Sequence, residues 1–140
     1  MRSERLKVAH LTECPIGGVL THLEELIIEQ IRDPDVQSIE ILSPEVNWGA
    51  FRHLQHPKLT VRSYGSRIRS LLGLVSLTTN AWRLVSHFEP DVVHLHSTIA
   101  GAIVRPLLFA GSDRPSIIYC PHGWVTLRTR ALFSERYTRL

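Results

Sequence analysis

The feature that most constrains this chain is a regular alternation of short apolar segments with longer amphipathic ones. Short apolar runs bounded by loop-forming residues are typical of buried strands, whereas apolar residues that recur every three or four positions are typical of helices. Strands are predicted at residues 6–11, 38–42, 58–62, 90–96 and 116–120. Because strands that alternate with helices form parallel sheets covered on both faces, we predict an α/β fold, doubly wound, mostly parallel and Rossmann-like.

Four helices are expected between and after these strands. The first ends before Pro34, because proline disfavours a helical residue in front of it. Its apolar residues at helical spacing are Leu20, Leu23, Ile27 and Ile31. The others are predicted over residues 67–88, 97–110 and 127–140, and Pro106 is expected to kink its helix or to delay its start.

The long helix predicted at residues 67–88 carries a broad apolar stripe. The stripe consists of Ile68, Leu71, Leu72, Val75, Trp82 and Val85, and it is widened by Leu74, Leu77 and Leu84. A stripe of this width is typical of a helix that lies flat on a sheet. We therefore expect residues 71–75 to face the core rather than a membrane surface.

The composition supports one globular domain. Of the 140 residues, 44% are hydrophobic and 21% are charged, which excludes a disordered, collagen-like or coiled-coil chain. No apolar run approaches the roughly 18–20 residues that span a bilayer. The formal net charge of +3 favours phosphate-bearing partners but is too small to require nucleic acid. We therefore expect a single soluble, cytoplasmic domain over residues 1–140.

The two cysteines, Cys14 and Cys120, both lie where a predicted strand ends. If the five strands, numbered along the sequence, lie side by side in the order 3-2-1-4-5, the strands that end at Cys14 and Cys120 are two positions apart, about 10 Å. That separation exceeds the roughly 7 Å between Cα atoms that a disulfide allows. We therefore expect two free thiols, which fits a reducing cytoplasm.

Arginines gather in two patches that flank apolar segments, at residues 67–69 and 128–139. They are Arg67, Arg69, Arg128, Arg130, Arg136 and Arg139. A solvated charged face is the interpretation we favour. The alternative is that these arginines bind anionic lipid head groups or a phosphorylated acceptor.

Three segments with polar or glycine residues follow predicted strands: Gly17-Gly18, His96-Ser97-Thr98 and His122-Gly123. In open parallel sheets, ligands bind beyond the carboxyl ends of the strands, where the strand order reverses. If the order is 3-2-1-4-5, this crevice opens between the first strand and the fourth. The sequence therefore predicts a binding site built from these three segments.

The glycine pair Gly17-Gly18 has two interpretations. The amino end of the helix that follows can hold an anion, and a side chain at either position would keep a phosphate away from the backbone. The other interpretation is a tight turn that needs glycine only for its dihedral angles. The pair is neither a dinucleotide-binding fingerprint nor a Walker loop, which argues against a dehydrogenase or a nucleotide hydrolase.

The histidines near the strand ends are candidate site residues. His94 and His96 share one face of a strand, and with His122 they could form a three-histidine zinc site. No acidic fourth ligand is evident, so we expect no metal. We expect instead that His94 lies inside the sheet with a hydrogen-bond partner and His96 at its lip. His122 is expected to contact or polarise a substrate hydroxyl rather than to cap a helix.

Four motifs together resemble the N-terminal half of a family 4 glycosyltransferase of GT-B architecture. They are Val8-Ala9-His10-Leu11-Thr12, then Gly17-Gly18-Val19 with His22-Leu23, Pro90-Asp91-Val92-Val93-His94-Leu95-His96-Ser97, and Ile117-Ile118-Tyr119-Cys120-Pro121-His122-Gly123. Their order and spacing match over nearly the whole chain. The resemblance implies an acceptor-binding N-terminal domain paired with a second, nucleotide-sugar-binding domain.

The resemblance also implies roles for single residues and a reaction. Gly17-Gly18 would approach the donor phosphate, and His122 would be the catalytic residue near the transferred sugar. His96, Ser97 and Gly123 would line the acceptor side. The reaction would move a sugar from a UDP- or GDP-sugar to a glycan or lipid-linked acceptor, with retention of configuration and without a metal or other cofactor. Peripheral contact with the inner face of the membrane is compatible with this role.

The second domain that the resemblance implies would carry a basic pair and two glutamates spaced Glu-x7-Glu, which these residues lack. We therefore expect a truncated domain or one subunit of a split enzyme, inactive alone. Two alternatives remain. One is a non-catalytic binding module or partner subunit. The other is half of a sugar-nucleotide epimerase, for which Glu13 is the sole acidic candidate near the end of the first strand.

Overall fold

The computed structural model describes residues 5–65, 70–109 and 114–122, and its central element is a five-stranded parallel sheet. The strands are β1 Leu6–Thr12, β2 Val36–Pro44, β3 Leu59–Tyr64, β4 Val92–His96 and β5 Ser116–Cys120. They lie side by side in the order β3-β2-β1-β4-β5, and each neighbouring pair is parallel. The predicted fold class is confirmed, and the strands lie in the order on which the expected position of the site depended.

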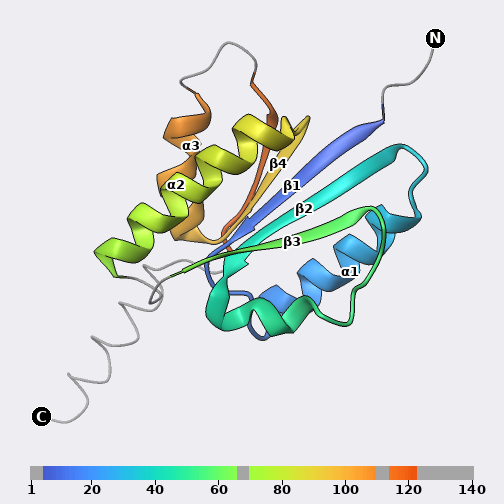
Figure 1. The fold of residues 1–140 in the computed structure, drawn as a ribbon, viewed down its shortest axis with the longest axis horizontal. Helices are drawn as coiled ribbons and strands as arrows, with labels where there is room; N and C mark the ends of the chain where they lie inside the picture. Colours follow the sequence, from blue (N-terminus) through green and yellow to red (C-terminus); the bar gives the residue numbers. More distant parts are fainter. Residues whose placement is uncertain (1–4, 66–69, 110–113, 123–140) are drawn as a thin grey trace, which may run out of the picture.

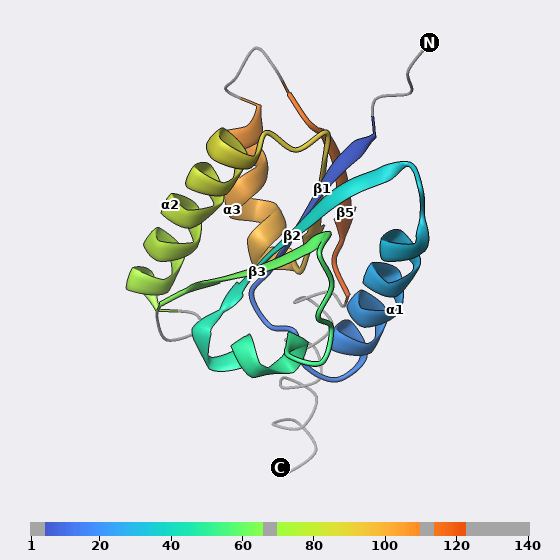
Figure 2. The same ribbon diagram turned by 45° about the vertical axis from the view of Figure 1, so that its right-hand side comes forward.

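Helices cover both faces of the sheet, as Figures 1 and 2 show from two directions. On one face lie α1 (Gly18–Arg32) and a short 3-10 helix, η1 (Glu45–Phe51), which the sequence analysis did not predict. On the other face lie α2 (Leu71–Phe88) and α3 (Thr98–Leu108). None of the helices in the described ranges is long and apolar enough to cross a membrane.

The core is divided by the sheet into layers. Between the sheet and the pair α2 and α3, the buried residues include Leu11, Leu42, Leu77, Leu84, Val93, Leu95 and Val104. Between the sheet and α1 with η1, they are Leu23, Ile27, Ile41 and Phe51. Successive residues of a strand point to opposite faces, so β1 and β4 send their odd-numbered residues toward α2 and α3. Their even-numbered residues, including three histidines, point to the α1 face.

Several boundaries differ from the prediction. Strand β2 is longer at both ends than residues 38–42, because its ends also pair with β1 and β3. Pro106 lies in the last turn of α3, and the helix begins at Thr98, so the proline does not delay its start.

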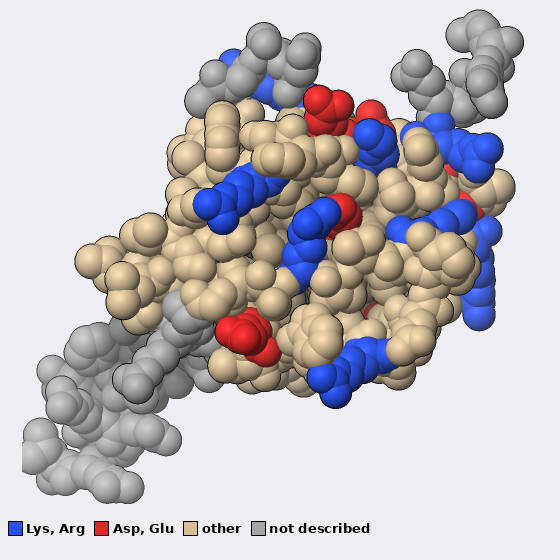
Figure 3. Space-filling view, viewed as in Figure 1, with Lys and Arg blue, Asp and Glu red and all other residues tan. Residues whose placement is uncertain are grey.

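The helix predicted at residues 127–140 and both arginine patches lie outside the described residues. On the face shown in Figure 3, the described lysine and arginine side chains are scattered rather than gathered in one patch.

The predicted core stripe of α2 is only partly correct, because Leu77 and Leu84 are buried but several of its bulkier members are exposed. The buried residues are Gly73, Leu77, Ala81 and Leu84. Leu71 and Leu72 are each 77% exposed, and Trp82 is 57% exposed. The prediction followed the bulkiest apolar residues, whereas two of the four buried positions are small residues, which let the helix approach its neighbours closely. Residues 71–75 therefore do not form the core-facing stripe that we expected.

Candidate functional site

The carboxyl ends of β1, β4 and β5 meet at one edge of the sheet, where the strand order reverses. From β1 the chain continues to β2 and β3 on one side, and then returns to place β4 and β5 on the other. The first turns of α1 approach this edge, because the ring centroids of His22 and His122 lie 5.1 Å apart. The segments that follow β1, β4 and β5 are thus brought together, as the sequence analysis predicted.

The glycine pair forms the start of α1. Gly17 is the N-cap, with φ 55° and ψ −133°, a conformation that disfavours any residue with a side chain. Gly18 is the first helical residue and has an ordinary φ. A Cβ at either position would meet no atom within 4 Å, so the space in front of both glycines is open. Gly17 therefore has a conformational reason to be glycine, whereas Gly18 does not.

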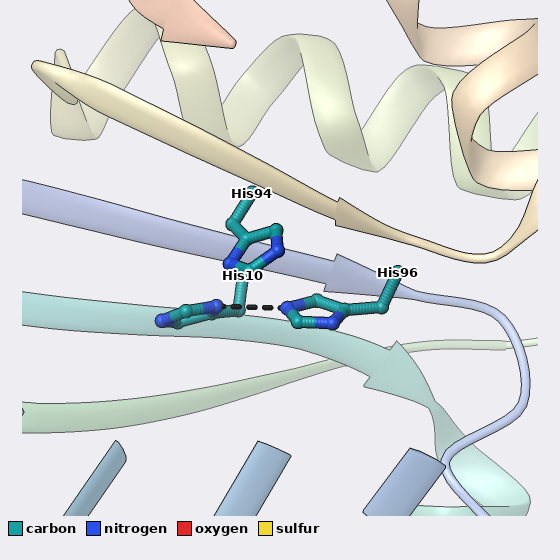
Figure 4. Close-up of side chains that lie close together, drawn as sticks. All are labelled: His10, His94 and His96. Atoms are coloured by element: carbon teal, nitrogen blue, oxygen red, sulfur yellow. Dashed lines mark hydrogen bonds between the residues drawn. The ribbon is translucent and has the colours of Figure 1, made fainter. Parts of the chain in front are cut away.

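Five histidines from four segments gather beside this edge, on the α1 face of the sheet. They are His10 on β1, His22 on α1, His94 and His96 on β4, and His122 after β5. The parallel register places His10 directly opposite His94. Figure 4 shows the rings of His10, His94 and His96 on the same side of β1 and β4. The prediction that His94 and His96 share a face is confirmed, and their ring centroids are 3.9 Å apart.

Three of these rings form a chain of nitrogen contacts that begins at Gln30. Nε2 of His10 lies 2.7 Å from Oε1 of Gln30, and Nδ1 of His10 lies 3.0 Å from Nε2 of His96. Nδ1 of His96 in turn lies 3.1 Å from Nε2 of His122. All three distances are those of good hydrogen bonds. The chain therefore runs from α1 through two buried strands to the loop after β5.

Burial keeps four of these imidazoles, those of His10, His94, His96 and His122, neutral. It lowers the pKa of His10 to about 4, opposed by the hydrogen bond to Gln30 and assisted by His94. It lowers the pKa of His94 to about 4 and that of His96 to about 2, and the neighbouring histidines act in the same direction. The pKa of His122 is also lowered by burial and by His22. At neutral pH these four rings are therefore acceptors and donors of hydrogen bonds, not cations.

The position of His96 differs from our prediction. We expected this side chain at the lip of the sheet, but it is fully buried, and His94 is 8% exposed. The reason is that three other histidine rings pack against it, with centroid distances of 5.2 Å to His10, 3.9 Å to His94 and 5.3 Å to His122. His122, which is partly exposed, is thus the member of the hydrogen-bonded chain that faces the edge.

Two backbone positions at this edge adopt strained conformations. Ser97 has φ 129° and His122 has φ 50°, both unusual for residues other than glycine. Ser97 caps α3, since its hydroxyl oxygen accepts from the backbone N–H of Ala100 at 3.2 Å. Its own N–H donates to the carbonyl of Cys120 at 3.1 Å, which ties the ends of β4 and β5 together. Such strain is common at functional sites. Gly123 lies outside the described residues.

Comparison with known proteins supports the fold. No protein-family model matches this chain, and no curated protein matches it significantly. Among solved structures, it is similar to one described as a crystal structure of UDP-N-acetylglucosamine 2-epimerase, with 14% identity and a TM-score of 0.57. The match covers 83% of this chain and 32% of that structure, so the chain spans about a third of its length. This likeness shows a Rossmann-like domain related to a GT-B-like fold.

Two groups of side chains have the composition and proximity of metal ligands. His10, His94 and His96 form a buried group, and His22, Cys120 and His122 form a more exposed one, each with ligand atoms within 4.8 Å of one another. Nitrogen and thiolate ligands suit zinc. In the buried group, however, the short contact between His10 and His96 is already a hydrogen bond.

Cys14 and Cys120 are both free thiols, as predicted.

The sequence analysis did not single out His10, His22 or Gln30 as site residues. A histidine in the middle of an apolar strand is a usable signal for His10, because such a side chain needs a buried polar partner. Its partner could not be named without the register between β1 and β4. Gln30 lies three turns along α1 from Gly18, on the side that faces the sheet, and only the packing of that helix reveals its contact with His10.

A cavity of about 850 Å³ lies away from these groups, between α2 and α3. Its lining includes Val92 and Ser116, the first residues of β4 and β5. It is therefore at the amino ends of the strands, opposite the histidines. Because ligands of such sheets bind at the carboxyl ends, we assign the functional site to the histidine edge rather than to this cavity.

Proposed function

We propose that this chain is the acceptor-binding half of a retaining glycosyltransferase, which moves a sugar from a UDP- or GDP-sugar to a glycan or lipid-linked acceptor. The observation that carries the proposal is the meeting of the glycine-led start of α1 with His122 at the carboxyl edge of a parallel sheet. A phosphate-binding backbone and a neutral imidazole at one edge suit a phosphorylated sugar donor. The motifs that resemble family 4 glycosyltransferases support the same assignment.

Gly17 and Gly18 take the role of donor-phosphate ligands in this proposal. The first backbone N–H groups of α1 have no partners within the helix, and the helix dipole favours an anion at this end. The open space in front of both glycines leaves room for a diphosphate oxygen to approach the backbone.

His122 takes the catalytic role, in contact with the transferred sugar. Its lowered pKa keeps the ring neutral, so that it can accept a hydrogen bond from a sugar hydroxyl at neutral pH. Ser97 and Gly123 take the acceptor side, and His96 acts there through His122 because it is buried. A second domain would hold the nucleotide and stabilise the leaving diphosphate without a metal. We further propose a cytoplasmic location, with peripheral membrane contact if the acceptor is lipid-linked.

Substitution of the two glycines separates phosphate binding from turn geometry. In the natural gene product that contains residues 1–140, Gly18→Ala is expected to raise the KM for the nucleotide sugar while leaving thermal stability nearly unchanged, because its φ suits alanine. Gly17→Ala is expected to lower stability as well, because of its positive φ. Steady-state kinetics and thermal melts check both. An unchanged KM in Gly18→Ala would argue against phosphate binding here.

Replacement of His122 tests the reaction itself. His122→Gly suits the φ of 50° and removes the imidazole, and it is expected to lower kcat by about 100-fold or more. The control is another histidine substitution, His87→Ala, on the exposed side of α2, which should leave kcat unchanged. Alanine replaces glycine in the control because a glycine would destabilise the helix. Mass spectrometry of products from a panel of UDP- and GDP-sugars identifies the reaction. An epimerised sugar nucleotide formed without any acceptor would replace our proposal with the epimerase, and binding without turnover would replace it with the binding module.

A further inference from the structure

The hydrogen-bonded chain of side chains that runs from Gln30 to His122 has more ring nitrogens than N–H protons. This difference decides which nitrogen of His122 carries the proton. A neutral imidazole carries one N–H and one bare nitrogen, so each ring donates on one side and accepts on the other. The rings of His10 and His96 use both nitrogens within the chain. The direction of the first hydrogen bond therefore sets the direction of every later one.

The first hydrogen bond is set by the side chain of Gln30. Its Oε1 faces Nε2 of His10 at 2.7 Å, and a carbonyl oxygen only accepts. His10 must then carry its proton on Nε2 and present a bare Nδ1 to His96. His96 must donate from Nε2 and present a bare Nδ1 to His122. His122 must donate from Nε2 to His96, and its Nδ1 is left as an acceptor.

We propose that Gln30, His10 and His96 are positioning residues that hold His122 in the Nε2–H tautomer, so that Nδ1 accepts a hydrogen bond from a sugar hydroxyl. The substrate class in this inference rests on the proposed function, whereas the tautomer does not. The chain does not transport a proton, because the amide oxygen of Gln30 is not a base at its far end. It selects one of the two neutral forms of the catalytic ring.

Burial is what makes the selection effective. His10 and His96 are both fully buried, so water cannot supply the alternative partners that let an exposed imidazole exchange between its two neutral forms. His94 packs its ring against His96 at 3.9 Å between centroids and lies beside the chain of nitrogen contacts rather than within it. His94 therefore offers a matched control: a buried histidine on the same strand, in contact with the same ring.

Nitrogen NMR of the 140-residue chain with ¹⁵N-labelled histidine tests the tautomer directly and needs no substrate. A hydrogen bond between two imidazoles gives a scalar coupling between the donor and acceptor nitrogens. We expect couplings from Nε2 of His96 to Nδ1 of His10 and from Nε2 of His122 to Nδ1 of His96. Each Nε2 should carry a slowly exchanging proton. Protons on Nδ1 of His10, His96 and His122 would reverse the chain and overturn the proposal.

Variants at the far end of the chain test whether Gln30 controls His122. Gln30→Glu keeps an acceptor in place and is expected to preserve the Nε2–H form of His122. Gln30→Met removes the acceptor and is expected to give a mixture of both tautomers at His122, although the two residues are not in contact. Because Gln30 is only half-buried, these variants should fold even if a core substitution does not.

The matched pair His96→Phe and His94→Phe tests the middle of the chain. His96→Phe should abolish both couplings and return the N–H of His122 to fast exchange with water. His94→Phe should leave both couplings in place. If His122 keeps one slowly exchanging Nε2–H in Gln30→Met and in His96→Phe, the chain does not select its tautomer and the proposal is wrong.

Kinetics of the natural gene product then separate this inference from the proposed function. If sugar transfer occurs, Gln30→Met should lower kcat several-fold without a change in KM, because the donor-binding groups are untouched. Wild-type couplings together with no sugar transfer would remove the proposed function and leave the tautomer selection standing. Sugar transfer in a protein that lacks the couplings would support the proposed function and overturn the tautomer selection.

Discussion

At Gly101 the missing side chain leaves room for an aromatic ring. A Cβ at this position would lie 2.8 Å from Cδ2 of Tyr119 and closer still to Cε2. Here the backbone of α3 and the ring of Tyr119, on β5, are in direct contact, and Tyr119 also packs against the core between the sheet and the pair α2 and α3. Small residues in this helix indicate close packing on a sheet, but only the position of Tyr119 shows why Gly101, the single glycine of α3, is required.

We expect Gly101→Ala to destabilise the protein. Overpacking costs about 1–3 kcal/mol, and this outweighs the gain of about 1 kcal/mol from better helix propensity. In a Tyr119→Ala background the same substitution should stabilise the protein, because the clash is absent and the propensity gain remains. Urea unfolding of the four proteins in this cycle measures both values. Equal effects in the two backgrounds would show that the ring moves aside without cost.

The helix α2 shows how an apolar pattern can leave the buried face of an element undecided. Apolar residues occur on several sides of this helix, so periodicity alone allows more than one core-facing stripe. The structure buries Leu77 and Leu84 and leaves Leu71 and Leu72 exposed. The choice is made by contacts with the sheet and with α3, which no local pattern contains.

Two leucines on α2 provide a test of this orientation. Leu77→Ala is expected to lower the free energy of unfolding by about 2–5 kcal/mol, because it leaves a cavity among buried residues. Leu72→Ala, the same chemical change on the exposed side, should alter it by no more than about 0.5 kcal/mol. Urea unfolding of both variants measures the difference. Similar losses in the two would mean that the exposed side of α2 is covered in the native protein.

Across the whole molecule, the buried imidazoles link the stability of the fold to pH. In the folded chain the pKa values of His10 and His94 are about 4, below the ordinary value of 6.5 that applies after unfolding. Between these values the unfolded chain binds more protons than the folded one. The contribution of the buried, neutral imidazoles to the free energy of unfolding is therefore fully present above about pH 6.5, and it is lost as the pH falls toward 4.

We expect the free energy of unfolding to fall as the pH is lowered from about 7 to about 4.5. Each histidine that is neutral in the folded state and protonated in the unfolded state contributes about 1.4 kcal/mol per pH unit. Urea unfolding at a series of pH values gives the slope. His96→Phe should reduce the slope, whereas His87→Ala on the exposed side of α2 should not. A stability that is flat over this range would contradict the buried, neutral state of the cluster.

The amino-acid sequence by itself determined the class of fold, the number of strands in the described residues, and which residues of a strand share a face. These properties follow from local backbone geometry, because strands and helices repeat with different periods and the spacing of apolar residues in the sequence shows which period applies. For this reason the common face of His94 and His96 and the carboxyl-edge position of Gly17 and His122 were predictable.

Only the tertiary structure decided which distant residues meet. His10 and His96 are 86 positions apart, and their contact depends on the register of β1 against β4. The burial of His96 depends on how α1 and the loop after β5 pack over the sheet. The same packing places Gln30 next to His10, where it begins the hydrogen-bonded chain of side chains. Register and packing are set by the sum of many weak contacts between residues far apart in the sequence. The local spacing of apolar residues contains no information about these contacts.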